Sequence, residues 1–590
     1  MLPKYNLITT ALKTKKSKYD KFYLGDWCIK YNNKNTSLDA SKHPYHWNDK
    51  KKLIKDYKYL KSLHPIILDT IYKKLNKELG INYKKIFWEI YLGPWLNYYL
   101  QVMFDRWEII DSFLKIHGDN FLTDKFDYDE NDFICKNLEE FVYSLYSDEY
   151  NHIIFNEILA YRLNTKNIFF NNGIKIKPLI KKKYKIGRNI KILRTFEKIF
   201  SSIIKKQNFL LFDTYLSRYE ETLLNLKLKQ IPTVHSPNLS LENWIIDRKF
   251  RREVFKYENK SNSFEDFLLK KLNLFIPSEF LENFSNLKDQ SNNLCWPKNP
   301  KIIFTSHALN NYSLSKFYIA DKVNHGCKLI HGQHGGVYGL DEFTTHEDYE
   351  LNVSNYFISW GWSHKEKIKP IGILKPIKNI SRKNNFKNND KDKLLYVLRS
   401  RSRYSVNLLH SDIRSSQMIT YYNENINLLS NIDDKIQKKT ILRLHSRKYG
   451  WDEKKRFSDC FNTIKIDEGH KKISDLIKKS RLVIHTYNTT GFLETLAANV
   501  PTIIYFNSKN NLIRNDAKVI FKELQKNKIY FSDAKEASDH INNVWNNIDL
   551  WWNNKETQST RKLFCTKYAK INDNKLNEIK NLIIESTYEK

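Results

Sequence analysis

Two histidines and three glycines share one short stretch of the chain, HGQHGG, at residues 331–336. A histidine titrates close to neutral pH and can act as a general base, and glycines let a backbone approach a ligand closely. His334 and His331 are therefore the first candidates for a catalytic base, and Asp341 and Glu342 just downstream are rival ones. In the structural alternative, the stretch is a tight turn whose histidines only hydrogen-bond the backbone.

Metal binding by His331, His334 and His346 is a weaker alternative, because no carboxylate or cysteine completes a recognisable ligand spacing. Glu350, a little further along, counts as one more rival base rather than as a ligand. We therefore expect no metal site and no cofactor.

Basic side chains gather at the ends of two apolar runs, KLLYVL and TILRL. An arginine guanidinium is planar and can bind two phosphate oxygens together. If the two runs are neighbouring parallel strands, these side chains converge on one cleft at the carboxyl edge of the sheet. A solvated basic face is the structural alternative. The candidate phosphate-binding residues of this group are Arg399, Arg401, Arg443, His445 and Arg447.

Residues 481–507, RLVIHTYNTTGFLETLAANVPTIIYFN, read as one strand, loop, helix and strand. Such a unit places Thr489, Thr490 and Gly491 at a helix N-terminus, where backbone N–H groups and the helix dipole favour a phosphate. Glu494, one turn further, is suited to accept hydrogen bonds from a ribose. Its structural alternative is an acid that stabilises the first turn of the helix.

The elements that must position these residues alternate between strand and helix from about residue 150 onward, which indicates parallel sheets in an α/β fold. A polar stretch that contains almost nothing to bury, KPIKNISRKNNFKNNDKDK, is the best candidate for a linker. We therefore expect an N-terminal helical element (1–150), a first α/β domain (151–374), a linker (375–393) and a second α/β domain with a helical tail (394–590).

The chain has 590 residues, 41% of them apolar, and a net charge of +33, so it is globular and strongly basic. The lysines are spread along the chain, which favours a general basic bias over a surface for phosphorylated or membrane-bound substrates. Nucleic acid is the least favoured partner, because no RRM, KH or C2H2 pattern is present.

Six cysteines lie far apart without a CxxC pair, which argues against a disulfide framework and indicates a reducing compartment. No apolar run is long enough for a membrane span, and the N-terminus lacks the apolar core of a signal peptide. We expect a cytoplasmic protein that is at most peripheral to the inner face of the cell membrane.

Five motifs together resemble a family of transferases encoded in bacterial lipopolysaccharide and surface-carbohydrate loci, and the resemblance spans nearly the whole chain. These motifs are YLGPWLNYYLQVMFDRW, HGQHGGVYG, ISWGW, RLHSRKYGW and TYNTTGFLETLAANVPTII. The last of them is also similar to the nucleotide-binding segment of GT-B glycosyltransferases. More distantly, the chain is similar to capsule Kdo transferases and CDP-glycerol glycerophosphotransferases, which share a His-Gly loop and a phosphate loop rich in serine and threonine.

The resemblance implies two Rossmann-like domains of the GT-B kind and transfer of a sugar from a nucleotide-activated donor to a glycan or lipid-linked glycan acceptor. It gives Thr489 and Thr490 the phosphate role, Glu494 the ribose role, and His334 or His331 the role of the loop histidine. Two alternatives stay open: a polyol-phosphate transferase of the CDP-glycerol type, and a non-catalytic basic protein that binds nucleic acid or anionic glycan.

Overall fold

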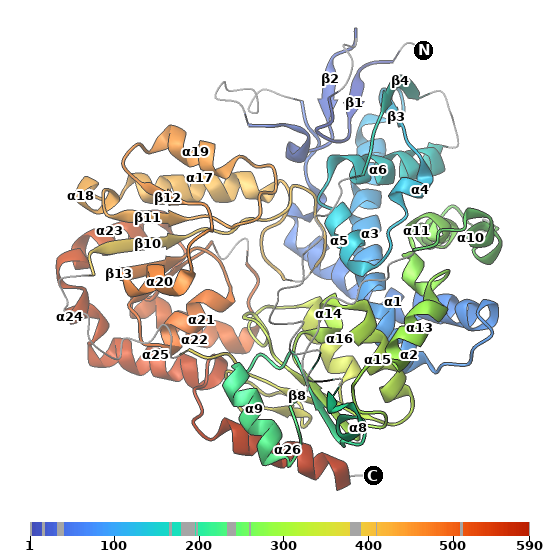
Figure 1. The fold of residues 1–590 in the computed structure, drawn as a ribbon. Coiled ribbons are helices and arrows are strands. Elements are labelled where there is room, and N and C mark those ends of the chain that lie inside the picture. The colour runs from blue at the N-terminus through green and yellow to red at the C-terminus, as the bar shows by residue number, and fades with distance from the viewer. Residues whose placement is uncertain are drawn as a thin grey trace.

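The computed structural model describes residues 3–13, 18–31, 41–163, 168–178, 195, 197, 199–232, 244–258, 261–377, 391–408, 410–507 and 511–588. Figure 1 shows an N-terminal part in blue and cyan, a first domain in green, a second domain in orange and the last helices in red. Each of the three parts contains a sheet, and the paired strands of all three sheets are parallel. The predicted α/β class with two Rossmann-like domains is confirmed.

The sheet of the first domain has its five strands in chain order, β5-β6-β7-β8-β9. The middle strands β6 and β7 are almost wholly buried, as is usual for parallel strands covered on both faces. Because all strands run the same way, the loops that follow them lie at one edge. The strands are β5 (Phe209–Leu211), β6 (Ile302–Thr305), β7 (Lys328–Gly332), β8 (Tyr356–Ile358) and β9 (Ile368–Lys369).

Helices of the first domain connect these strands. At the start of α9, the Ser217 hydroxyl accepts from the backbone N–H of Glu220, and the Glu220 carboxylate accepts from the N–H of Ser217. This capping box satisfies two N–H groups that the helix cannot pair itself. The helices are α8 (Ser201–Ile204), α9 (Arg218–Lys227), α14 (Ala308–Asn311), α15 (Ser313–Asn324) and α16 (Thr345–Val353).

The sheet of the second domain has the order β12-β11-β10-β13-β14-β15. The chain starts in the middle at β10, adds strands on one side and then returns to add strands on the other. This reversal between β10 and β13 is the point of a doubly wound sheet at which ligands bind. The strands are β10 (Lys393–Val397), β11 (Thr440–Arg443), β12 (Lys465–Asp467), β13 (Ser480–His485), β14 (Thr502–Tyr505) and β15 (Tyr530–Phe531).

The predicted strand, loop, helix and strand of residues 481–507 is present as β13, α21 and β14. Pro501 directly precedes β14, as the sequence suggested. The helices of this domain are α17 (Gln417–Ser430), α18 (Asp434–Gln437), α19 (Glu453–Cys460), α20 (Ile473–Lys478), α21 (Thr490–Ala497), α22 (Asn515–Lys526), α23 (Ala534–Val544), η5 (Trp545–Asn547), α24 (Ile548–Trp552) and α25 (Lys555–Tyr568).

The N-terminal part is not helical throughout, because its strands form a parallel sheet of the order β2-β1-β3-β4. Its helix α6 also continues past residue 150, so no element ends there. The strands are β1 (Asn6–Ile8), β2 (Lys21–Tyr23), β3 (Leu122–Asp127) and β4 (Phe169–Lys175). The helices are η1 (Asp26–Cys28), η2 (His46–Asn48), α1 (Lys50–Glu78), α2 (Lys85–Tyr91), α3 (Gly93–His117), α4 (Glu130–Phe133), α5 (Leu138–Ser144) and α6 (Asp148–Leu163).

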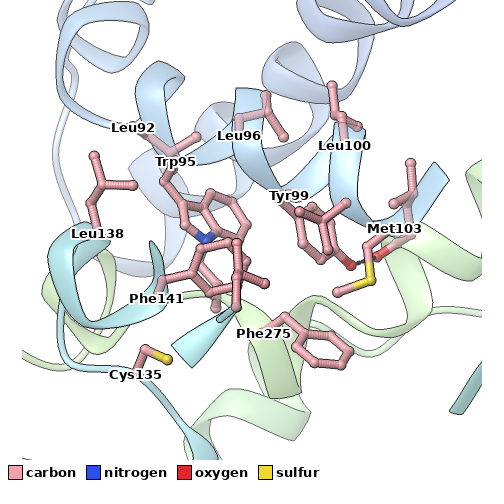
Figure 2. Close-up of a cluster of buried hydrophobic side chains, with 14 of the residues drawn as sticks. Leu92, Trp95, Leu96, Tyr99, Leu100, Met103, Cys135, Leu138, Phe141 and Phe275 are labelled. Atoms are coloured by element: carbon pink, nitrogen blue, oxygen red, sulfur yellow. Dashed lines mark hydrogen bonds between the residues drawn. The ribbon is translucent and has the colours of Figure 1, made fainter. Parts of the chain in front are cut away.

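One hydrophobic core joins the N-terminal part to the first domain. Figure 2 shows Trp95 and Tyr99 of α3 packed beside Phe141 and Phe275. The Tyr99 hydroxyl donates to the carbonyl of Leu268 at 2.7 Å. The short helices between β5 and β6 complete this core. They are α10 (Arg248–Val254), α11 (Phe264–Lys270), α12 (Leu272–Phe275), η3 (Ser278–Phe280) and α13 (Phe284–Asn292).

The helical tail returns to the first domain. Helix α25 packs on α22 and α21 of the second domain, but α26 (Lys575–Tyr588) lies beneath α9 (Figure 1) and shares a core with β5 and β6. Between the two helices, the Lys570 N–H donates to Trp360 O and the Lys570 carbonyl accepts from the Ile373 N–H. The chain therefore crosses between the domains a second time here.

The predicted linker falls largely outside the described residues, of which 375–377 and 391–393 belong to it. All six cysteines are free. Among the residues that the structure describes, no helix combines the length and the apolar character that crossing a bilayer requires.

Candidate active site

Three loops at the carboxyl edge of the first-domain sheet meet around His334. Tyr215 follows β5, His307 follows β6, and His334 follows β7. The ring centroid of His334 lies 5.2 Å from that of His307 and 6.2 Å from that of Tyr215. The edge-to-face geometry of both contacts leaves the rings packed but not stacked.

A buried carboxylate from α16 lies between the two predicted bases. Glu350 Oε2 is 3.5 Å from His331 Nδ1, and Glu350 Oε1 is 3.6 Å from His334 Nδ1. Asn310 also donates to Glu350 Oε1 at 3.2 Å. The His331 side chain has no exposed surface, whereas that of His334 keeps 13%. Of the two candidate bases, His334 is thus the one that a substrate can reach.

Burial sets the protonation of this group. It lowers the pKa of His331 to about 3 and the pKa of His334 well below its usual range, and it raises the pKa of Glu350. At neutral pH both imidazoles are therefore uncharged and keep a free nitrogen lone pair. A neutral imidazole can accept a proton or bind a cation.

The His-Gly loop meets the N-terminus of α21 directly. The Gly336 N–H donates to Thr490 Oγ1 at 2.7 Å. A Cβ atom on Gly336 would lie 2.4 Å from the backbone nitrogen of Thr490, so only glycine fits where the two domains touch. Gly335 is less confined, because a Cβ atom added there would lie 3.5 Å from its nearest neighbour, Thr490 Oγ1. The two loops that the sequence singled out therefore face each other.

Asp341 also crosses the domain boundary, but as a buried hydrogen-bond acceptor. Its carboxylate accepts from the Ser411 N–H at 3.2 Å and from the Asn488 side chain. Burial and the nearby Asp412 raise its pKa well above the usual range. Glu342 is exposed and pairs through its backbone with Leu512. Neither carboxylate lies with the histidines, so the geometry favours His334 over both as a base.

Two of the predicted arginines lie in the loop after β10. The Arg399 guanidinium pairs with Asp412 at 2.5 Å and stacks over Tyr487, 4.7 Å from its ring centroid. Arg401 lies 3.4 Å from the same carboxylate and keeps 26% of its side chain exposed. Arg399 is thus held inside the loop, whereas Arg401 is accessible to a ligand.

The residues at the end of β11 are less favourably placed. Arg443 pairs with Asp467 at the end of β12, and its guanidinium donates to the carbonyls of Lys471 and Gly469 at 2.8 and 3.2 Å. Its donors are largely used within the protein. His445 and Arg447 are exposed, and the Arg447 guanidinium lies over Tyr146 of the N-terminal part.

At the start of α21, Thr489 has extended backbone and makes no side-chain cap, so its side chain does not occupy the first N–H groups of the helix. Gly491 leaves room for the His485 ring, which a Cβ atom would approach to 2.7 Å. Glu494 is partly buried and pairs with Lys375 at 2.6 Å. A ribose at Glu494 would have to share the carboxylate with this lysine.

A cavity of about 130 Å³ lies beside Arg401, between the loop after β10 and the N-terminal part. Tyr98 of α3 and Tyr449 form part of its wall, and Arg414 and His410 are among its polar groups. Arg414 Nη1 and His410 Nδ1 are buried without a hydrogen-bond partner. The cavity thus offers polar groups and aromatic surface beside the loop after β10.

Several residues of the site escaped sequence reasoning. Asp412, Arg414 and Lys375 lie in or beside irregular segments, where no periodicity marks them. Glu350 was recognised only as a rival base. One signal was available for it, because His346 and Glu350 are four residues apart and therefore share a face of α16.

Two parallel-sheet domains whose loops meet through a glycine and a helix N-terminus define a two-domain fold of the GT-B-like kind. A family model matches residues 5–583, and the chain belongs to that family, the LIC12162 family transferases. The predicted membership of a transferase family is confirmed, and the protein is a transferase. No curated protein matches the chain.

Solved structures show distant similarity. The chain is 9% identical to MurG from Acinetobacter baumannii over 64% of this chain and 98% of MurG, with a TM-score of 0.29. It is 10% identical to WaaG, a glycosyltransferase involved in lipopolysaccharide biosynthesis, over 51% of this chain and 95% of WaaG, with a TM-score of 0.28. It is 10% identical to the UDP-GlcNAc 2-epimerase from Neisseria meningitidis over 66% of this chain and 95% of the epimerase, with a TM-score of 0.30.

Proposed function

We propose that the protein transfers a sugar from a nucleotide-activated donor to a glycan or lipid-linked glycan acceptor of the cell surface. The observation that carries this proposal is the contact between Gly336 and Thr490. It joins a loop with candidate bases in the first domain to an anion-binding helix N-terminus in the second. In this proposal residues 151–374 hold the acceptor and residues 394–590 hold the donor.

The donor phosphate would lie at the reversal between β10 and β13. Val397 and His485 are paired there, so the loops that follow both strands start side by side. The N–H groups at Thr490 and Gly491 would bind phosphate oxygens, and Arg401 would stabilise the charge that grows on the leaving phosphate. The cavity beside Arg401 supports this placement, because it supplies further unpaired donors.

The acceptor would lie in front of His334. In the reaction, the acceptor hydroxyl oxygen forms a bond to the anomeric carbon of the sugar, the bond from that carbon to the phosphate oxygen breaks, and the nucleotide leaves with the electron pair. The hydroxyl proton passes to the group formed by His334 and Glu350. The neutral state of His334 supports this role, since a charged imidazole could not take a proton.

The chemistry of the acceptor is supported by charge. Although the lysines are spread along the chain, a net charge of +33 would favour anionic glycans and the anionic surface of a membrane that carries a lipid-linked acceptor. Nucleic acid is a weaker candidate, because the transferase family gives the chain a catalytic role.

Isothermal titration with CMP, CDP, UDP and GDP tests the donor site. We expect one nucleotide to bind, and we expect Arg401→Leu to weaken its binding by about tenfold, as for a lost charge-assisted hydrogen bond. Thr490→Val keeps the backbone N–H but removes the hydroxyl that accepts from the Gly336 N–H, so we expect it to weaken binding because the two loops lose this contact. Arg252→Leu, on the exposed face of α10, is the matched control and should bind like the wild type. Absence of binding to all four nucleotides, or equal binding by all variants, would refute the proposal.

A further inference from the structure

Three side chains of the histidine cluster lie close enough together to bind one metal ion, although they come from two separate segments of the chain. His334 comes from the loop after β7, and His346 and Glu350 come from one face of α16. One ligand atom from each of the three lies within 4.8 Å of the others. We infer that His334, His346 and Glu350 bind a divalent transition-metal ion, with zinc as the ion that best suits two imidazoles and a carboxylate.

The distances suit such an ion after small side-chain adjustments. Zinc bonds to imidazole nitrogen and carboxylate oxygen at about 2.0–2.2 Å, so ligand atoms of a tetrahedral site are about 3.4 Å apart. His334 Nδ1 and Glu350 Oε1 are already 3.6 Å apart. Two histidines and one glutamate also form the protein ligand set of several catalytic zinc sites, in which a fourth position stays open.

Two polar atoms at the centre of the cluster lack a hydrogen-bond partner. His334 Nδ1 and Glu350 Oε2 are buried and make no hydrogen bond. Glu350 has no exposed surface, and among the described residues the basic groups within ion-pair distance of it are the imidazoles of His331 and His334. A buried carboxylate without a lysine or arginine is costly, and a bound cation would remove that cost.

Groups behind the ligands would hold them in place. The Asn310 amide donates to Glu350 Oε1 at 3.2 Å, which fixes the carboxylate as outer-shell partners do in metal sites. His331, 3.5 Å from Glu350 Oε2, supports the same carboxylate from the interior.

There is space beside the three side chains for a fourth ligand of the metal ion. A cavity of about 10 Å³ is lined by His346 and Asn310, together with Asn97 and Tyr98 of α3. This volume accommodates about one water molecule. Tyr98 and Asn407 also line the larger cavity beside Arg401, so the open position would face the side of the cavity between the loop after β10 and the N-terminal part.

The binding of the ion is independent of the proposed function, but its role in the reaction rests on that function. A hydroxyl group bound at the open position would lose its proton more easily, because a zinc ion lowers the pKa of a bound oxygen ligand by several units. With His334 and Glu350 held as ligands, this proton would pass to water, and the ion would supply the activation that the proposed function gives to these two side chains. The substrate class is then an acceptor alcohol that replaces the bound water.

Metal analysis of the protein, purified without a chelator or a histidine tag, tests the site. We expect about one zinc or related ion per chain, which is lost in His346→Gln and Glu350→Gln. After chelation, Co²⁺ alone should restore a tetrahedral visible absorption spectrum in the wild type, with affinity lowered by more than about tenfold in both variants. His325→Gln, an exposed histidine at the end of α15, is the matched control and should keep the metal.

If His346→Gln and Glu350→Gln unfold, a variant with a cysteine in place of a histidine ligand still tests the site. His346→Cys should retain a metal ion and give the Co²⁺ complex a thiolate-to-metal absorption band, which a purely structural histidine would not produce. A wild type that binds neither zinc nor Co²⁺, or a His346→Cys protein that binds Co²⁺ without this band, would overturn the inference.

The two proposals fail separately. If the protein binds a nucleotide but no metal ion, the metal site is refuted and the donor site stands. If it binds a metal ion but no nucleotide, the donor site is refuted and the metal site stands. Titration of the chelated protein with the nucleotide makes the distinction, because Thr490 and Arg401 belong to the other domain and should bind it at unchanged affinity.

Discussion

Gly336 has no space for a side chain, and this absence lets its backbone contact the start of α21. Its N–H group binds Thr490, and its α-carbon lies against the backbone of residues 489 and 490. A close backbone approach of this kind positions a helix N-terminus more firmly than a side-chain contact would, because a backbone has little freedom to move away. This glycine therefore contributes to the separation between His334 and the first turn of α21, alongside the apolar core that the two domains share.

Replacing Gly336 by alanine should separate the two loops. The new Cβ atom would lie 2.4 Å from the Thr490 nitrogen, and relief of that contact should cost about 1–3 kcal/mol, seen as a lower midpoint of thermal unfolding. Nucleotide affinity should fall as well. Gly335→Ala is the matched control, because its Cβ atom would make an ordinary contact of 3.5 Å. Equal midpoints for both variants would contradict this account of the interface.

Buried histidines give the protein a pH dependence. Burial lowers the pKa of His485, behind α21, to about 3, whereas in the unfolded chain it is near 6.5. Between these values the unfolded state binds a proton that the folded state does not, so the stability from this group is present above about pH 6.5 and is lost as pH falls towards 3. The loss is at most about 1.4 kcal/mol per pH unit.

The measurement is the thermal midpoint at about pH 7.5 and about pH 5.5 for the wild type and His485→Gln. The wild type should lose more stability on acidification than the variant. Asp341 and Glu350, whose pKa values burial raises, change stability in the opposite direction, but both proteins contain them. A parallel shift of both proteins would show that His485 does not titrate in this way.

At the residue level, the sequence predicted which side chains to consider but not what each one contacts. HGQHGG and Thr489–Gly491 stood out because glycines and hydroxyls follow apolar runs. The pairing of Arg443 with Asp467, or of Glu494 with Lys375, joins residues far apart in sequence, so no local pattern indicates it. The catalytic and donor-binding roles remain predictions.

Among the elements, the strands that flank the sheet reversal matter most. The loops after β10 and β13 begin at paired residues, but they differ in character. The loop after β13 is short and leads into α21, whereas the one after β10 reaches residue 416 before α17 begins. The long loop contacts the N-terminal part through Arg403 and Tyr404, which both bind Asp148 of α6. Its conformation is therefore fixed by a different part of the chain.

Two arginines that follow neighbouring strands should have different roles, Arg443 in stability and Arg401 in nucleotide binding. Arg443→Leu leaves the mostly buried Asp467 without its cation and should destabilise the protein by about 1–3 kcal/mol with little effect on nucleotide affinity. Arg401→Leu should do the reverse, since its side chain is more exposed. Thermal unfolding and titration of both variants make the comparison. Loss of nucleotide affinity in Arg443→Leu, at unchanged stability, would place Arg443 in the donor site instead.

Elements were predictable where an apolar run has clear ends. The unit at residues 481–507 is an example, because Pro501 stops the helix and precedes the strand. The N-terminal sheet was missed, since β1 and β2 have only three residues each and lie among polar segments. The order of strands in a sheet depends on long-range pairing, which a single sequence does not contain.

In the whole molecule, the first domain is completed by both ends of the chain. Its core on one side is shared with α2 and α3, and on the other side with α26. Ile579 and Ile583 of α26 are fully buried against the sheet and α9. The two crossings between the domains, at the predicted linker and near Lys570, make each domain depend on the other for its position.

Truncation of one buried tail residue should show this dependence. Ile583→Ala leaves a cavity in the core of the first domain and should cost about 2–5 kcal/mol, seen as an earlier unfolding transition. Ile571→Ala, which removes the same atoms from a side chain that is 58% exposed, is the matched control and should change stability by less than about 0.5 kcal/mol. An unchanged transition in Ile583→Ala would mean that α26 is not needed for the first domain.

The return of α26 to the first domain also determines when that domain can be completed during synthesis. Its first strand, β5, begins at Phe209, but the residues that cover it end at Tyr588, about 380 residues later. At a synthesis rate of about 5–20 residues per second, the apolar face of β5 and α9 stays uncovered for about 20–80 s until α26 has been synthesised. The second domain, whose strands all lie between β10 and β15, has its whole sheet before then. All strands of the second-domain sheet are therefore synthesised before α26, which completes the core of the first domain.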